Sequence, residues 1–176
     1  MKQKSILLIS HGHFDELCLD LIAERTEQEF GYPVILQENH RDISTYYNPA
    51  RRQYDANRLL RLLAVYKSPA IIKTIALVRV DLFIPILTYL FGQAYFKGNT
   101  GIVSVYRLRN EQYGMPPDQN LLIERLQKVL IHEIGHTFGL VHCTVPVCVM
   151  RSSTYVEDID QKDSVLCEKC RGQIQL

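Results

Sequence analysis

Residues 132–142 read HEIGHTFGLVH, and the spacing of the three histidines in this stretch constrains how the chain folds around it. His132 and His136 are four residues apart, so on a helix they share one face and both imidazoles can bind one metal ion. Glu133 is rotated by about 100° from His132, because an α-helix has 3.6 residues per turn, and it borders the same face. The short pattern H-E-x-x-H predicts a metal site on a helix, but two chance histidines on a half-exposed face are about as consistent with it.

Gly139 and His142 make the pattern far more specific. A helix that continued to His142 would carry that imidazole to another side of the helix, about 9 Å further along the axis. Because glycine tolerates positive φ, Gly139 can end the helix and turn the chain so that His142 meets the same ion. Three protein ligands leave the fourth position of a zinc ion open for water, as in catalytic sites. The full spacing is the metzincin signature, in which Glu133 is the catalytic general base that takes a proton from this water.

Four of the five cysteines lie in the last 34 residues and predict a second metal site. Cys143 and Cys148 have four residues between them, and Cys167 and Cys170 form a C-x-x-C pair; both spacings fit a closed, structural site of four thiolates. Neighbouring side chains of an extended segment point to opposite faces, so His142 and Cys143 are predicted to serve different ions. Two disulfides or a redox pair are disfavoured by the lack of a secretory signal and of a thioredoxin-like context. We therefore expect two Zn²⁺ per chain, one catalytic and one structural.

Strands alternate with helices along the chain, which predicts an α/β fold with a mixed sheet. The 176 residues suffice for one domain with a full core and are too few for two of ordinary size. We expect one catalytic domain over residues 1–176, with an upper part of residues 1–139 that carries the active-site helix and a C-terminal part of residues 140–176. The expected strands are residues 5–10, 33–37, 74–84, 91–96 and 101–108. The expected helices are residues 15–29, residues 57–66 and a helix that starts near Pro116, with Asp118 or Asn120 as its cap. Residues 38–55 are expected to be a loop.

Composition and charge restrict the partners. Hydrophobic residues make up 47% and charged residues 22%, as in soluble globular proteins. The net charge is +1 without a dense Lys/Arg tract, which argues against a nucleic-acid partner. The most apolar region, residues 82–96, contains Pro85 and falls short of the about 20 residues that span a bilayer. The apolar run of residues 6–9 is too short for a signal peptide, so we expect a cytoplasmic monomer without a membrane partner.

Met150 lies eight residues past His142, between the two cysteine pairs. An isolated methionine usually fills a core, but after this signature a methionine turn (Met-turn) below the metal site is the better interpretation. The combination HEIGHTFGLVHC, followed by C-x-M and a distant CEKC, resembles the archaemetzincins. FGQAYFKGN followed by IVSVYRLR resembles the edge strand of that family and the strand after it, so the resemblance extends over the chain.

By position, the resemblance implies that His132, His136 and His142 bind catalytic zinc and that Glu133 is the base. It implies a structural zinc on the four cysteines, Cys143, Cys148, Cys167 and Cys170. The implied fold is a metzincin-like, twisted mixed sheet of about five strands with an active-site helix and a short zinc-stapled C-terminal subdomain. One departure is Gln93, which stands where the edge strand of the family is expected to carry an acid for N-terminal amine recognition.

The function that this resemblance implies is a zinc-dependent peptidase, aminopeptidase-like on short peptides, in which Glu133 activates zinc-bound water. The alternative is a catalytically silent zinc-binding or interaction protein that keeps the fold. Glu133 favours the peptidase, because a purely structural site of three histidines needs no base. A metallohydrolase of non-peptide amides would use the same residues.

Some residues are assigned no role. His11 and His13 follow the first expected strand, where a solvated turn is favoured over a metal site. Ser152 stands two residues after Met150, where some other metzincins have a zinc-ligating tyrosine, and Tyr155 lies nearby. An aromatic and basic cluster fits a substrate site and a packed surface loop about equally well; it comprises Tyr46, Tyr47, Arg51, Arg52 and Tyr54.

Overall fold

A five-stranded sheet forms the centre of the protein. The computed structural model describes residues 3–64 and 68–174. The strand order is β2-β1-β5-β9-β8, in which β8 pairs antiparallel with β9 and the other pairs are parallel. The expectation of a mixed sheet of about five strands is therefore confirmed, and β8 is one of its edges. The bounds are β1 Ser5–His11, β2 Val34–Asn39, β5 Ile71–Val78, β8 Gly92–Ala94 and β9 Thr100–Ser104.

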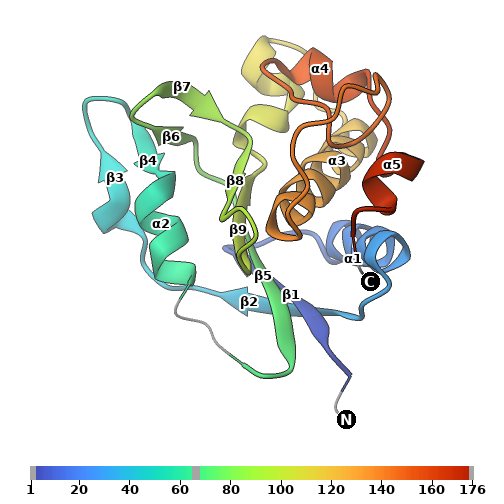
Figure 1. Cartoon of the computed structure of the whole chain (residues 1–176). Coiled ribbons are helices and arrows are strands. Elements are labelled where there is room, and N and C mark those ends of the chain that lie inside the picture. Colours follow the sequence, from blue (N-terminus) through green and yellow to red (C-terminus); the bar gives the residue numbers. More distant parts are fainter. Residues whose placement is uncertain (1–2, 65–67, 175–176) are drawn as a thin grey trace.

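Helices cover both faces of this sheet (Figure 1). The helices α1, Glu16–Phe30, and α3, Gln119–Thr137, lie on one face, and α2, Ala56–Leu63, lies on the other. Successive side chains of a strand point to opposite faces. Accordingly Ile75 and Leu77 of β5 belong to the core shared with α1 and α3, and their neighbours Ala76 and Val78 belong to the core shared with α2. A strand buried on both faces needs a continuous apolar run, and residues 75–78 supply one.

The two long helices begin at aspartate caps. The side chain of Asp15 accepts a hydrogen bond from the backbone N–H of Cys18 at 3.0 Å, and Gly31, with φ of 70°, ends α1. The side chain of Asp118 accepts from the N–H of Leu121 at 3.0 Å, so Asp118 is the cap of α3. Each N-cap contributes about 1 kcal/mol to stability. Both helices therefore start where a side-chain oxygen satisfies a free backbone donor.

A second sheet has the strand order β3-β4-β6-β7. Two predictions were wrong here. Residues 38–55 contain a 3₁₀-helix and the antiparallel pair β3–β4, rather than only a loop, and the rings of Tyr47 and Tyr54 lie 5.2 Å apart across that pair. The predicted single strand over residues 74–84 is two strands in different sheets. The bounds are β3 Tyr47–Asn48, β4 Gln53–Asp55, β6 Leu82–Ile84 and β7 Leu87–Leu90.

The break between β5 and β6 has a physical cause. Asp81 is buried there, and its carboxylate accepts hydrogen bonds from the Arg107 guanidinium at 2.6 and 2.9 Å. This ion pair fixes the point at which the chain leaves the first sheet. Arg107 belongs to a 3₁₀-helix, Tyr106–Leu108, where sequence predicted the end of a strand. Residues 65–67 of the predicted helix 57–66 lie outside the described residues.

The C-terminal part follows α3 and has two short helices, α4, Val156–Asp160, and α5, Glu168–Arg171. It packs against α3 and α1 (Figure 1). Over residues 3–64 and 68–174, every helix falls short of the length and hydrophobicity that a membrane crossing requires.

Candidate metal centres

The three histidines of the signature converge on one point. The Nε2 atoms of His132 and His136 lie 3.0 Å apart, and ligand atoms of His132, His136 and His142 all lie within 4.8 Å of one another. Nδ1 of His132 donates to the carbonyl oxygen of Val149, and Nδ1 of His136 to that of Leu140, both at 2.8 Å. Because these Nδ1 atoms carry the proton, each Nε2 keeps its lone pair for a metal ion.

The histidines are held in the state that a metal ligand needs. Burial lowers the pKa of His132 well below its usual value, and the charge of Lys162 and the other two imidazoles add to the effect. Burial is also the main cause that lowers the pKa of His136 and His142. Imidazoles must be neutral to bind a metal, so these shifts favour binding at neutral pH.

The end of α3 brings His142 round to the other two. Gly139 has φ of 93°, its N–H donates to the carbonyl of His136, and the N–H of Leu140 donates to that of Gly135, both at 3.0 Å. These two bonds form a Schellman motif, which reverses the chain after the last helical turn. The left-handed conformation at Gly139 is one that side chains rarely adopt.

Glu133 lies buried beside the histidines in a cleft of about 430 Å³. Burial raises its pKa to about 8, against the opposing charge of Lys162. The backbone of β8 packs directly on it, because a Cβ added at Gly92 would lie 2.7 Å from Cγ of Glu133 and 2.9 Å from the carbonyl oxygen of Ile102. Gly92 was missed by sequence reasoning. Glycine inside a strand often marks a close approach of this kind, and that was the available signal.

The cleft runs between β8, α3 and the segment after Met150. Among the described residues that line it, Glu133 is the only carboxylate and Lys162 the only lysine or arginine. Gln93 lines the cleft, and its Nε2 donates a hydrogen bond to Oδ1 of Asn57 at 2.8 Å. Tyr155 does not line the cleft and is 63% exposed. The lining residues are Ile84, Leu87, Tyr89, Leu90, Phe91, Gly92, Gln93, Ala94, Val129, His132, Glu133, His136, His142, Ser152, Ser153, Thr154, Ile159 and Lys162.

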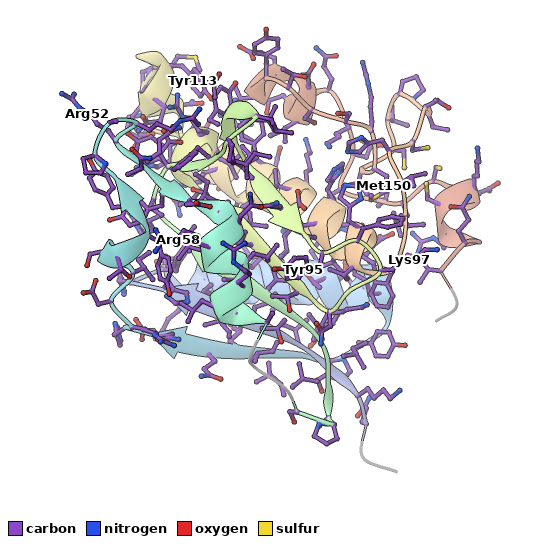
Figure 2. All side chains as sticks on the ribbon, turned by 60° about the vertical axis from the view of Figure 1, so that its left-hand side comes forward. Arg52, Arg58, Tyr95, Lys97, Tyr113 and Met150 are labelled. Carbon is purple, nitrogen blue, oxygen red and sulfur yellow. The ribbon has the colours of Figure 1, made fainter. Side chains whose placement is uncertain are left out.

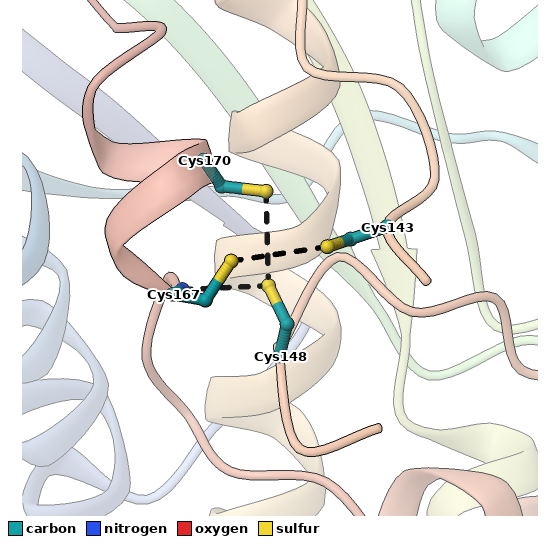
Figure 3. Close-up of side chains that lie close together, drawn as sticks. All are labelled: Cys143, Cys148, Cys167 and Cys170. Carbon is teal, nitrogen blue, oxygen red and sulfur yellow. Dashed lines mark hydrogen bonds between the residues drawn. The ribbon is translucent and has the colours of Figure 1, made fainter. Parts of the chain in front are cut away.

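The side chains of four cysteines converge in a second cluster (Figure 3). The Sγ atoms of Cys143 and Cys167 are 3.8 Å apart, as are those of Cys148 and Cys170, and all four lie within 4.8 Å of one another. A tetrahedron with zinc–sulfur bonds of about 2.3 Å has sulfur–sulfur edges of about 3.8 Å. The cluster therefore has the size of a four-thiolate zinc site. A hydrogen bond from the backbone of Cys170 is the main cause that lowers the pKa of Cys167 to about 7, whereas burial raises the pKa of Cys148 and Cys170.

Met150 lies between the two clusters and is fully buried. A Cβ added at Gly135 would clash with the sulfur of Met150, and the carbonyl of Met150 accepts a hydrogen bond from the N–H of Cys143 at 3.0 Å. Lys97 packs over Gly139 at the end of the same helix; Figure 2 shows Met150 and Lys97 on the same side of the molecule.

The other residues considered in the sequence lie outside these clusters. His11 is the last residue of β1 rather than part of a turn, and it is half-buried. The fifth cysteine of the chain, Cys18 of α1, is buried in the hydrophobic core, and burial raises the pKa of its thiol. The rings of Tyr46, Tyr47 and Tyr54 do not line the cleft.

Comparisons with known proteins agree with this geometry. The model of Peptidase family M54 matches residues 19–176. The archaemetzincin of Methanocaldococcus jannaschii is 34% identical over 165 residues, which cover 93% of this chain and 89% of that protein. The crystal structure of archaemetzincin from Methanopyrus kandleri has a TM-score of 0.85 at 31% identity and covers 99% of this chain and 94% of its own.

A zinc-dependent peptidase from Methanocorpusculum labreanum has a TM-score of 0.88 at 30% identity and covers 97% of this chain and all of its own. Fold and sequence therefore agree over almost the whole length. The expected assignment to a zinc metallopeptidase family is confirmed, and the chain belongs to peptidase family M54, the archaemetzincins.

Proposed function

We propose that the protein hydrolyses peptide bonds at a catalytic zinc bound by His132, His136 and His142, with Glu133 as the general base. The observation that carries this proposal is the convergence of one ring nitrogen from each of the three histidines in a cleft beside a buried carboxylate. A site that only held the fold together would gain nothing from Glu133, because burying a carboxylate there costs free energy.

When bound, the zinc would act as a Lewis acid that makes a water molecule more acidic and polarises the scissile carbonyl. Glu133 accepts the proton of the attacking water on a carboxylate oxygen and later delivers it to the leaving amine. Burial raises the pKa of this carboxyl, which makes its ionised form a stronger proton acceptor than an exposed glutamate. The carbonyls of Val149 and Leu140 keep two of the imidazoles in the correct orientation throughout.

The cysteine cluster would hold a second, structural zinc, which makes two Zn²⁺ per chain. Its ligands are Cys143, Cys148, Cys167 and Cys170. Met150 would form the methionine turn below the histidines, and Gly139 is the glycine that ends the active-site helix. Residues 1–176 would form one catalytic domain, with residues 1–139 as its upper part and residues 140–176 as its C-terminal part.

We further propose an aminopeptidase-like activity on short peptides. The cleft has room for only a few residues, and the outer edge of β8 beside it is free to pair with an extended peptide by strand addition. The proposal also places the protein in the cytoplasm as a monomer without a nucleic-acid partner. None of the five cysteines, all of which lie in the described part of the chain, forms a disulfide, which fits a reducing compartment. The net charge of +1 offers no general attraction to nucleic acid.

The test compares wild type with Glu133→Gln, which keeps the shape of the side chain and removes the base. Both are assayed for zinc content and for hydrolysis of a mixed library of aminoacyl and peptide substrates. We expect two zinc ions in both proteins and a turnover that falls by about 10²–10⁴-fold in the variant. Equal turnover in the two proteins would reject the assigned base, and zinc without turnover in either would favour a binding role.

A further inference from the structure

Lys162 is a buried lysine that lines the cleft. The proposed hydrolysis assigns it no role. Its side chain is 3% exposed, and it follows α4 in the chain. Its charge acts on Glu133 and on all three histidines, which places the ammonium group near the reacting centre.

The ammonium group of Lys162 makes fewer hydrogen bonds than it can. It can donate three hydrogen bonds, and among the described residues it donates one, to the carbonyl oxygen of Arg151 at 2.8 Å. No carboxylate of the described chain lies within ion-pair distance of it. Arg125 of α3, which is also buried, shows the contrast, because its guanidinium is paired with Asp160 at 2.6 Å. Burying an unpaired charge costs free energy, so a structural role alone explains Lys162 poorly.

The surroundings of Lys162 indicate which ligand it suits. Val129 of α3 and Ile159 of α4 are buried apolar residues that line the same cleft, and Ser152 and Thr154 of the loop before α4 line it as well. An apolar wall with one cation accepts a short aliphatic stem that ends in an anion. Peptides carry one anion of this kind, the carboxylate.

We propose that Lys162 forms a carboxylate-binding subsite of the cleft, which holds a carboxylate of the peptide substrate. This inference rests on the proposed function for the identity of the substrate as a peptide. The carboxylate has two possible sources, the side chain of an acidic residue and the free carboxyl terminus of a very short peptide. Lys162 forms an ion pair with either, beside the base Glu133.

The test measures binding and requires no turnover. Two pairs of small ligands are titrated into the zinc-loaded protein and followed by NMR. N-acetyl-glutamate N-methylamide against the glutamine analogue reports on an acidic side chain, and N-acetyl-alanine against its amide reports on a free carboxyl terminus. We expect the carboxylate member of at least one pair to bind about tenfold more tightly to wild type. The pair that shows this preference identifies the source.

Variants assign the preference to Lys162. In Lys162→Met, we expect the carboxylate and the uncharged ligand of each pair to bind about equally. Lys162→Arg keeps the charge, and we expect it to retain the preference for the carboxylate. Lys128→Met is the matched control, because Lys128 is a buried lysine of α3 that does not line the cleft. If Lys162→Met fails to fold, Lys162→Gln is used in its place. The glutamine amide keeps a donor for the Arg151 carbonyl and removes the charge.

Two results would overturn the proposal. One is that wild type binds both members of each pair equally. The other is that the preference survives in the uncharged variant, since the carboxylate would then bind the metal rather than Lys162. Because these titrations are independent of hydrolysis, they separate a failure of the subsite from a failure of the peptidase function.

Discussion

Gly92 and Gly135 show how little space surrounds the reacting residues. Gly92 of β8 touches Glu133, and Gly135 of α3 touches Met150. The histidines and Glu133 are predictable from sequence because their spacing is local, within one helix and the turn after it. The contact between Gly92 and Glu133 joins residues 41 positions apart, and only the pairing of strands with α3 creates it. No periodicity along the chain could reveal such a contact.

Replacement of Gly92 by alanine should reduce activity through Glu133. The new methyl group would need the space that Cγ of Glu133 occupies, and the Ile102 carbonyl blocks retreat on the other side. A displacement of about 1 Å in a catalytic group can cost about 10²-fold in rate. We expect a lower kcat with unchanged zinc content, measured by steady-state kinetics and metal analysis. Gly172→Ala is the control, because an added Cβ there meets only ordinary contacts, the nearest at 3.4 Å. A kcat equal to that of wild type in Gly92→Ala would show that the position of Glu133 does not depend on β8.

His11 should make stability depend on pH. Burial, with the charge of Arg41, lowers the pKa of His11 below its usual 6.5 in the folded protein. The unfolded chain therefore binds this proton first as the pH falls, so the stabilisation present above about pH 6.5 is lost as the pH falls through the folded pKa. We expect the stability difference between wild type and His11→Gln to shift against wild type from pH 7.5 to pH 5, by chemical denaturation at both values. A constant difference would contradict the shift.

At the scale of elements, capped helices were predictable and short strands were not. The aspartates at positions 15 and 118 mark helix starts in the sequence itself. The strands of the second sheet have two to four residues, too few to show alternation, and β7 was not predicted at all. The split between β5 and β6 depends on Arg107, which reaches Asp81 from a segment 26 residues away. Tertiary contacts therefore decide what local pattern leaves open.

The C-terminal segment should depend on its metal. Cys167 and Cys170 tie α5 to the turn that contains Cys148, and a zinc site of this kind contributes folding energy directly. We expect Cys167→Ser to contain about one zinc fewer per chain and to melt roughly 10 °C lower, which corresponds to about 3 kcal/mol at this chain length. Metal analysis and thermal denaturation measure both. Cys18→Ala, a buried thiol outside the cluster, should keep the full metal content; an unchanged Cys167→Ser would remove the structural site.

On the scale of the whole molecule, the two parts of the chain share one core. Buried side chains of β1, α1, α3 and the C-terminal segment form a single cluster, from Ile6 to Ile174. Glu29 of α1 joins the parts by polar contacts, because its buried carboxylate accepts from the N–H of Leu166 at 2.9 Å and from Arg171 at 2.7 Å. This shared cluster supports the proposal that residues 1–176 form one domain.

A shared core of this kind should unfold in one step. We expect a single calorimetric transition for the zinc-loaded protein, with a calorimetric enthalpy equal to the van't Hoff enthalpy. Two resolved transitions, or a ratio of the enthalpies well above one, would show that residues 140–176 unfold separately. The same scan on Glu29→Gln tests the polar link, and we expect a lower melting temperature in that variant with the single transition preserved.

The adjacency of His142 and Cys143 bears on the order in which the two proposed metal sites fill. One peptide bond joins the residue of one centre to the residue of the other, and the N–H of Cys143 is held by the carbonyl of Met150. On a newly made chain, we expect capture of a metal by the thiolates to fix Cys143 and thereby to set the approach of His142. The proposed thiolate centre should then fill first, and hydrolytic competence should appear only afterwards. A short supply of zinc would yield inactive chains without folded tails, rather than folded enzymes that merely lack the catalytic ion.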